Sequence, residues 1–181
     1  MTYYGAKELA DSFRTVRNNT LKIAEEIPED KYSFSAAPKT RTVALTLAHI
    51  AVSYQFQYMM QSEKRTNFDG LDFPTLFQRF VAEQDKPRTK AEILELLRST
   101  GDTWAQFVEG LSESFLGETV SMPPGTTPAT KGRLEMILSV KEHEMHHRGQ
   151  LMLVERMIGI VPHLTRDMEA RMTEMTKART A

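Results

Sequence analysis

Apolar residues recur every three or four positions along most of the chain, the spacing that places them on one face of an α-helix. Stretches in which apolar and polar residues alternate, as in a half-buried strand, are nearly absent. The pattern predicts long helices over 6–26, about 42–64, from 89 onward, and about 133–158. Four long helices with a long crossover between them predict an all-α protein, a four-helix bundle.

Local signals sharpen the helix boundaries. Thr89 and Glu92 have the spacing of a capping box, in which each side chain binds a backbone N–H group at the start of a helix. Pro74 suits a first helical turn and predicts a short extra helix between the second and third long helices. Gly159, just beyond the last apolar repeat, predicts the end of the fourth long helix.

Two further segments complete the organisation of the chain. Residues 117–132, GETVSMPPGTTPATKG, are rich in proline and glycine and predict a long loop without strands. Residues 165–177 predict an amphipathic tail helix, either docked on the core or packed against a partner. Because no linker or repeat interrupts the pattern, we expect a single domain over 1–181, with a core over about 5–160 and a helical tail over about 164–178.

The composition excludes several classes of function. Basic and acidic residues number 23 and 24, so no basic stripe suited to a phosphate backbone is expected, and we predict no nucleic-acid partner. No apolar run is long enough to cross a membrane, and the N-terminal residues lack a signal-peptide pattern, so a cytoplasmic protein is expected. The absence of cysteine leaves His, Asp, Glu or water as metal ligands. The 11 methionines are expected mainly in core packing.

Candidate chemistry is concentrated in the segment KEHEMHHRGQ at 141–150, which holds three of the five histidines. At about 100° per residue, His143 and His147 lie together in the middle of the apolar face, and His146 points toward a flank or solvent. Two buried imidazoles side by side leave several ring nitrogens in need of partners, and one shared cation would satisfy a nitrogen on each. The spacing therefore predicts that His143 and His147 bind one metal ion.

A third ligand should come from another helix. His49, in the segment TLAHI, lies on the same helical face as Leu45 and Val52, whereas His163 follows a helix end and is expected to be exposed. Three histidines leave a coordination position open, as in catalytic zinc sites. Glu144, about 60° from the histidine face, is expected to orient a ligand, act as a base, or remain an ordinary surface residue.

The segment His143–His147 also matches the H-E-x-x-H signature of zinc proteases, but the rest of the pattern does not. A metzincin needs a glycine three residues after the second histidine, and here Gly149 follows by two. No third histidine follows at the required distance, and no strand is predicted that could align a peptide substrate. We therefore interpret the match as coincidental.

With TLAHI and EHEMHHRGQLMLVERMIG in place, the chain resembles the DinB-like (DinB/YfiT-like) metalloenzyme family over nearly its whole length. The resemblance implies a bundle in up-down-down-up order with extra short helices, often a homodimer. It also implies one divalent metal ion per chain, held by His49, His143 and His147. Zinc and nickel both suit imidazole ligands, and iron is a further candidate.

The same resemblance extends to Arg148, Gly149 and Gln150, which match the R-G-Q of the family. Gly149 is expected to permit close approach of a neighbouring helix, and Gln150 to form a hydrogen bond near the metal site. For His146 three roles stay open: a bystander, a residue that supports a ligand, or a contact to substrate.

For function, the resemblance implies a metal-dependent enzyme of thiol-transferase or hydrolase type. Its substrate would be a small molecule, with a low-molecular-weight thiol as a candidate. Two alternatives stay open: a non-catalytic, stress-associated helical dimer whose metal is structural or vestigial, and an interaction module that uses methionine-rich faces and no metal.

Overall fold

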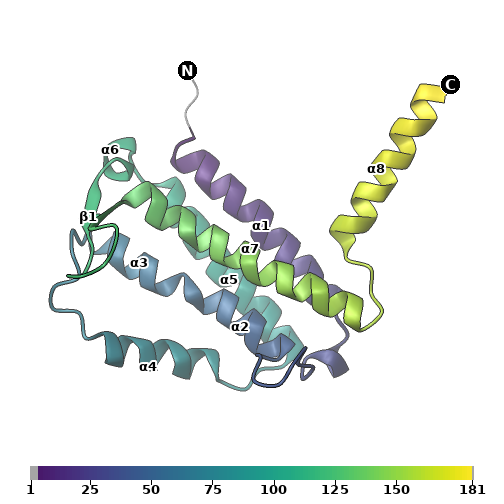
Figure 1. Cartoon of the computed structure of the whole chain (residues 1–181), viewed down its shortest axis with the longest axis horizontal. Helices are drawn as coiled ribbons and strands as arrows, with labels where there is room; N and C mark the ends of the chain where they lie inside the picture. Colours follow the sequence, from purple (N-terminus) through teal and green to yellow (C-terminus); the bar gives the residue numbers. More distant parts are fainter. Residues whose placement is uncertain (1–3, 181) are drawn as a thin grey trace.

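The computed structural model describes residues 4–180 and confirms an all-α four-helix bundle. The long helices are α1 (Ala6–Glu26), α2 (Val43–Ser53) continued by α3 (Gln55–Ser62), α5 (Lys90–Glu109) and α7 (Arg133–Met157) (Figure 1). The shorter elements are the 3₁₀ turn η1 (Glu29–Lys31), α4 (Phe73–Gln84), α6 (Glu113–Leu116), β1 (Thr119–Ser121), β2 (Thr130–Gly132) and α8 (His163–Thr180). Within the described residues, no helix combines the length and apolar character needed to cross a membrane.

The helix directions follow from contacts between their ends. Lys90, at the start of α5, donates to the carbonyl oxygens of Glu25 and Ile27 near the end of α1, so these two helices are antiparallel. α7 runs parallel to α1, because Lys141 donates to Ser12 and, further along both helices, Glu144 accepts from Arg17. α4 crosses back along the α2–α3 rod, which lets α5 run in the same direction as α2 (Figure 1). The order is therefore up-down-down-up, as predicted.

The core divides into two main clusters along the bundle. Ile23, Leu47, Leu97 and Leu151 belong to one, and Phe13, Trp104 and Ile137 to the other. The second helix contributes Val43, Leu47, Ile50 and Ala51 to the core, and Leu45, on the face predicted from the sequence, is only partly buried. The predicted capping box of Thr89 and Glu92 is present at the start of α5.

Methionine departs from the expectation of core packing. Met60 and Met136 are buried, but the exposed methionines are Met145, Met157, Met168, Met172 and Met175. Three of these exposed side chains lie on α8, beyond the core of the bundle, where no core is available to cover them.

Two secondary-structure predictions need correction. The second long helix is interrupted at Tyr54, where the backbone keeps helical angles (φ −65°, ψ −22°), so α2 and α3 continue one rod. The segment predicted to be an unbroken loop contains an antiparallel pair, in which Val120 of β1 lies opposite Lys131 of β2. Val120 is fully buried and packs against Met60 and Met136, so a long-range contact stabilises strands too short to predict from the local pattern.

The prediction that His163 is exposed was wrong. Gly159 adopts a left-handed conformation (φ 86°) after α7, and the N–H of Ile160 binds the carbonyl of Glu155, as in a Schellman turn. This turn returns the chain toward α1, where His163 is 1 % exposed and its Nε2 lies 3.3 Å from Asn19 Oδ1. Beyond this anchor, α8 projects away from the bundle (Figure 1) and is not docked along the core.

A buried ion pair joins α1 to α7. The guanidinium of Arg17 donates to both carboxylate oxygens of Glu144 at 2.9–3.1 Å, and the two side chains are 4 % and 1 % exposed. Arg17 also donates to the carbonyl of Leu97 on α5. Gly101 makes room for this arginine, because a Cβ atom there would lie 2.8 Å from Arg17 Cγ.

We expect Gly101→Ala to destabilise the protein by about 1–3 kcal/mol, because Arg17 is anchored and cannot yield to the added methyl group. The matched control is Gly149→Ala on α7, where a Cβ would meet nothing within 4 Å. That exchange should stabilise the protein by up to about 1 kcal/mol through helix propensity alone. Urea unfolding measures the free energy of unfolding of both variants. An equal increase in the two variants would contradict close packing around Arg17.

Candidate metal centre

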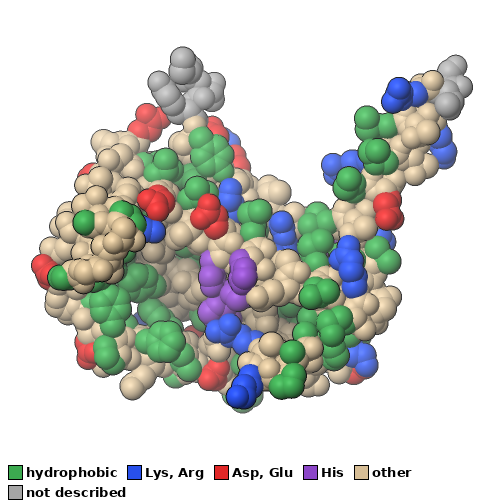
Figure 2. Space-filling model, in the orientation of Figure 1, with side chains coloured by type: hydrophobic (Ala, Val, Ile, Leu, Met, Phe, Trp, Pro, Cys, Tyr) green, Lys and Arg blue, Asp and Glu red, His purple; other side chains and the backbone are tan. Residues whose placement is uncertain are grey.

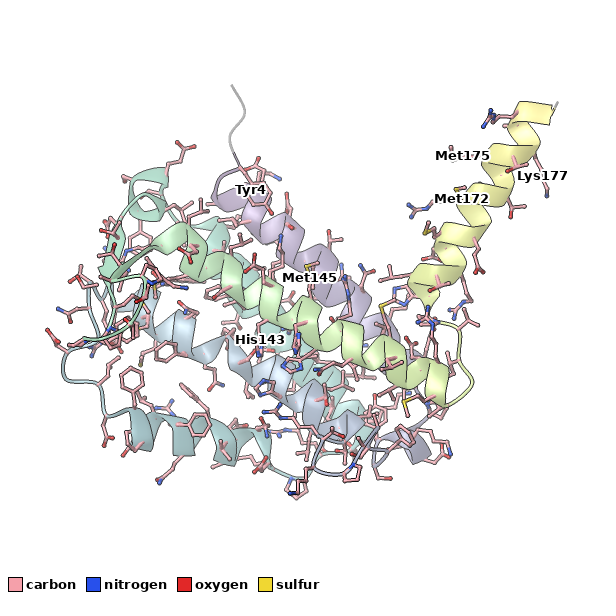
Figure 3. The ribbon with its side chains drawn as sticks, viewed as in Figure 1. Tyr4, His143, Met145, Met172, Met175 and Lys177 are labelled. Carbon is pink, nitrogen blue, oxygen red and sulfur yellow. The ribbon has the colours of Figure 1, made fainter. Side chains whose placement is uncertain are left out.

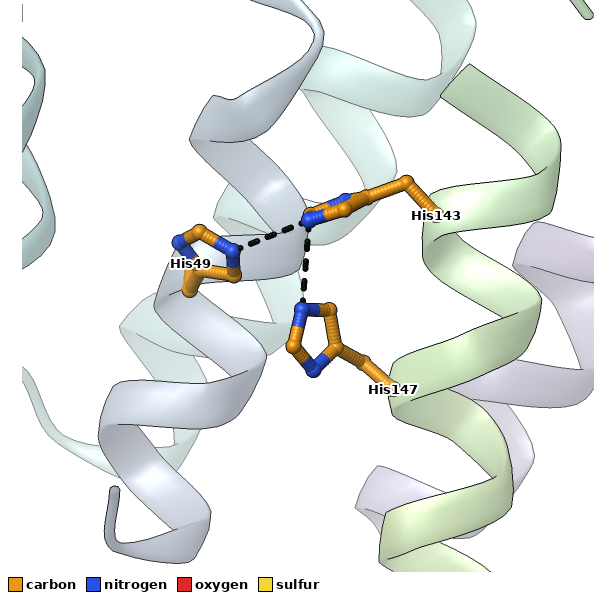
Figure 4. A group of neighbouring side chains, drawn as sticks. All are labelled: His49, His143 and His147. Carbon is orange, nitrogen blue, oxygen red and sulfur yellow. Dashed lines mark hydrogen bonds between the residues drawn. The ribbon is translucent and has the colours of Figure 1, made fainter. Parts of the chain in front are cut away.

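Three imidazoles meet between α2 and α7, as Figure 4 shows. Nε2 of His143 lies 3.2 Å from Nε2 of His49 and 3.2 Å from Nε2 of His147. His143 and His147 lie one turn apart on α7, and His49 faces them from α2 across 94 positions of sequence. The structure thus brings the three predicted ligand residues to one point, where they form a group that could hold a metal ion.

The orientation of His49 is set by a residue that the sequence pattern did not reveal. Gln84, the last residue of α4, lies with Oε1 2.8 Å from Nδ1 of His49, and its amide nitrogen donates to the carboxylate of Asp85. Because a carboxylate only accepts, the amide oxygen of Gln84 must face His49, and Nδ1 must carry the proton. Nε2 of His49 therefore presents a lone pair to the other two rings.

Gln150 contacts His147 as Gln84 contacts His49. Its Oε1 lies 2.8 Å from Nδ1 of His147, and its amide nitrogen lies 3.0 Å from Nε2 of the exposed His146. In this arrangement Gln150 accepts from His147 and donates to His146, so Nε2 of His147 also presents a lone pair. His146 is outside the three-ring cluster, on the flank that its helical position predicts.

His143 is left without a full set of partners. Its Nδ1 is buried and has no hydrogen-bond partner in the described part of the chain. Its Nε2 faces two lone pairs and donates to one of them in the Nε2–H tautomer and to neither in the Nδ1–H tautomer. A cation shared by the three Nε2 atoms would remove this conflict.

The electrostatic surroundings keep the three rings neutral. Burial, reinforced by the positive charge of Arg41, lowers the pKa of His49 to about 4. Burial, with a smaller effect of His147, lowers the pKa of His143 to about 4 as well. The pKa of His147 is also lowered, again mainly by burial. Neutral imidazoles at neutral pH are the form that ligates a metal.

The nitrogen spacing agrees with a shared ion. Zinc–nitrogen bonds of 2.0–2.1 Å place the ligands of a tetrahedral site roughly 3.3 Å apart. The two Nε2 separations of 3.2 Å match that spacing, and all three ligand atoms lie within 4.8 Å of one another. The donor set of imidazoles without thiolate or carboxylate suits zinc, nickel and iron alike.

Glu144 takes no part in this cluster. Its carboxylate is buried and bound to Arg17, on the side of α7 that faces α1, so it is not free to act as a base or to orient a histidine ligand. The helical pattern placed Glu144 at the edge of the histidine face but could not reveal the arginine that faces it. Gly149, expected at a close helix contact, is exposed and has no such neighbour, which corrects that prediction.

A cavity of about 660 Å³ opens beside the cluster, with His146 and His147 in its wall. Figure 2 shows histidine side chains reaching the surface next to Lys or Arg side chains. The site is therefore accessible to a small molecule from solvent.

Comparisons with known proteins agree with this architecture. A family model described as the DinB superfamily matches residues 12–151. YjoA of Bacillus subtilis is 22 % identical over 155 residues, which cover 85 % of this chain and 91 % of YjoA. The crystal structure of YjoA, a DinB-like protein, matches with a TM-score of 0.61 over 84 % of this chain and 92 % of that one.

Two more distant structures share the fold. YfiT of Bacillus subtilis, described as a probable metal-dependent hydrolase with an unusual four-helix bundle topology, is 12 % identical with a TM-score of 0.67, over 88 % of this chain and 91 % of YfiT. The colibactin self-resistance protein ClbS, solved in complex with double-stranded DNA, is 16 % identical with a TM-score of 0.56, over 84 % of this chain and 98 % of ClbS. Because one neighbour binds DNA, the absence of a nucleic-acid partner stays a prediction for this chain.

If Glu144 is a structural partner of Arg17, Arg17→Met should destabilise the protein by about 3–5 kcal/mol, because it leaves a carboxylate buried without its counter-charge. The double variant Arg17→Met/Glu144→Leu should recover most of that loss. Arg14→Met is the control, since Arg14 binds Glu109 at the surface and its removal should cost at most about 1 kcal/mol. Urea unfolding measures all three, and a double variant no more stable than Arg17→Met would contradict the pairing.

Proposed function

Because the chain belongs to the DinB superfamily and three of its imidazole nitrogens converge beside an open cavity that His147 lines, we propose that it is a divalent-metal-dependent enzyme acting on a small molecule. The convergence of the Nε2 atoms of His49, His143 and His147 is the observation that carries the proposal. These residues would hold one metal ion per chain, zinc or nickel, with iron as a further candidate. The reaction would be of hydrolase or thiol-transferase type.

The residues around the cluster have separate tasks in this proposal. Gln84 and Gln150 fix the tautomers of His49 and His147, so that the ligating nitrogens are directed to one point without rearrangement. A bound divalent ion would lower the pKa of a water or thiol ligand and so supply a nucleophile near neutral pH. With Glu144 bound to Arg17, the described residues that line the cavity include no carboxylate. His146 is thus the side chain there suited to exchange a proton with substrate.

The first test is the metal content of the purified protein, measured by elemental analysis. We expect about one metal ion per chain in the wild type and a loss of most of it in His49→Ala, since each ligand is one of three. His146→Ala is the matched control, a histidine removed from the same surface without removing a ligand, and should retain its metal. Wild-type protein without metal, even after incubation with zinc or nickel, would refute the proposal.

Metal removal separates the enzyme from the alternative of a structural metal. A structural ion should contribute strongly to folding, so chelation should lower the thermal midpoint by many degrees. For a catalytic site on a preformed bundle, chelation should abolish activity with a smaller change in the midpoint.

One observation favours dimerisation as well. α8 lies outside residues 12–151 and carries a stripe of apolar side chains, Leu164, Met168, Met172 and Met175, at helical spacing. The three methionines are 66 %, 56 % and 62 % exposed, and Figure 3 shows Met172 and Met175 on the projecting helix. Asp167 and Glu169 in the first half of α8 lie beside Arg166 and Arg171, and Lys177 and Arg179 lie in its last turn, so the apolar stripe is flanked by charges of both signs. The proposed partner is a second copy of the chain.

Met172→Glu should convert the proposed dimer to a monomer, because it places a charge in the centre of the apolar stripe. Ala170→Glu adds the same charge on the opposite face of α8 and should leave the dimer intact. Gel filtration with light scattering gives the mass of each variant. A wild-type protein that is already monomeric at micromolar concentration would contradict the assembly.

A further inference from the structure

The cavity beside the histidines has two chemically different walls. Leu151 and Val154 of α7, with Val43 at the start of α2, form an apolar wall. The segment before α2, here called the rim, contributes Lys39 and Arg41 to the same cavity. A volume of about 660 Å³ is in the range of small-molecule binding sites, which are typically about 300–1,000 Å³.

The two cations on this rim have no counter-charge. Neither Lys39 nor Arg41 takes part in an ion pair or hydrogen bond within the described residues, whereas arginines such as Arg17, Arg88 and Arg133 are each bound to a carboxylate. No described Asp or Glu lines the cavity, although the chain contains 24 acidic residues. This side of the cavity therefore carries positive charge that no described lining carboxylate compensates.

The segment that carries these cations is held by its own hydrogen bonds. The hydroxyl groups of Ser35 and Thr40 lie 2.8 Å apart, and Thr40 also donates to the carbonyl of Ala37 at 2.7 Å. Lys39 adopts φ of 66°, a conformation that a residue with a Cβ rarely takes and that costs free energy. Thr42 then caps α2 through the N–H of Leu45. The rim is thus preorganised, and Arg41 extends from it at the edge of the histidine cluster.

We propose that this cavity binds small molecules with an anionic group, a carboxylate or a phosphate, held by Arg41 and Lys39, and with an apolar body packed against Leu151 and Val154. Arg41 can bind either anion with two parallel hydrogen bonds, and Lys39 adds a second charge. His147 lines the same cavity, so a ligand held by Arg41 and Lys39 would lie next to the histidine cluster. This inference rests on the proposed function, for which it names the class of substrate.

The test compares three probes that share one apolar chain: hexanoate, hexyl phosphate and hexan-1-ol. Ligand-observed NMR titration gives the affinity of each for the purified wild-type protein. We expect both anions to bind at least about tenfold more tightly than the alcohol, the order expected for a charge-assisted pair. The ratio of the two anion affinities identifies which acidic group the rim prefers. Equal binding of hexan-1-ol and the anions, or no binding of any probe, would overturn the inference.

Arg41→Gln should lose about tenfold or more in affinity for the anions and leave that for hexan-1-ol unchanged. Arg79→Gln removes the same charge from an exposed arginine of α4 that does not line this cavity, and it should bind all probes as the wild type does. An unchanged anion affinity in Arg41→Gln would refute the role of the rim. Metal content measured on the same samples should be equal in the three proteins. Wild-type protein without metal would refute the proposed function. The affinities for the two anions would still test the role of the rim in that case.

Discussion

The buried ion pair between Arg17 and Glu144 is the constraint on which the site depends. α7 is covered on two sides, by α1 and by the α2–α3 rod, so its rotation about its own axis decides which residues face each neighbour. By fixing Glu144 toward α1, the pair directs His143 and His147 toward α2. A buried carboxylate without its arginine would be costly, so alternative rotations of α7 are strongly disfavoured.

The crossover helix α4 is part of the connection that the topology requires, and it also contributes a residue to the candidate site. In an up-down-down-up bundle the second and third long helices run in the same direction, so a segment must return along the length of the bundle. The helix in that segment, α4, ends at Gln84, whose amide fixes the tautomer of His49. The same connection that permits the fold therefore supplies a hydrogen bond that orients His49, a candidate metal ligand.

The histidine cluster consists of neutral groups, whereas the rim of the neighbouring cavity carries charged groups. Burial keeps His49 and His143 neutral, which suits a metal, and the uncompensated charge of Arg41 stands at the rim, where a substrate anion would enter. With a metal bound at the histidines, this separation would let one small bundle combine a Lewis acid with an anchoring charge.

The sequence alone determined the features that depend on a single helix. Helical periodicity defined the long helices and the fold class, the spacing of Thr89 and Glu92 defined a cap, and His143 and His147 were paired because i and i+4 share a face. Tertiary structure decided whatever joins residues far apart in the chain. Only folding shows that Glu144 binds Arg17, 127 positions away, that Gln84 holds His49, and that His163 is buried against Asn19. A residue's own helix determines its direction, but its partner comes from another helix, and no local pattern encodes which one.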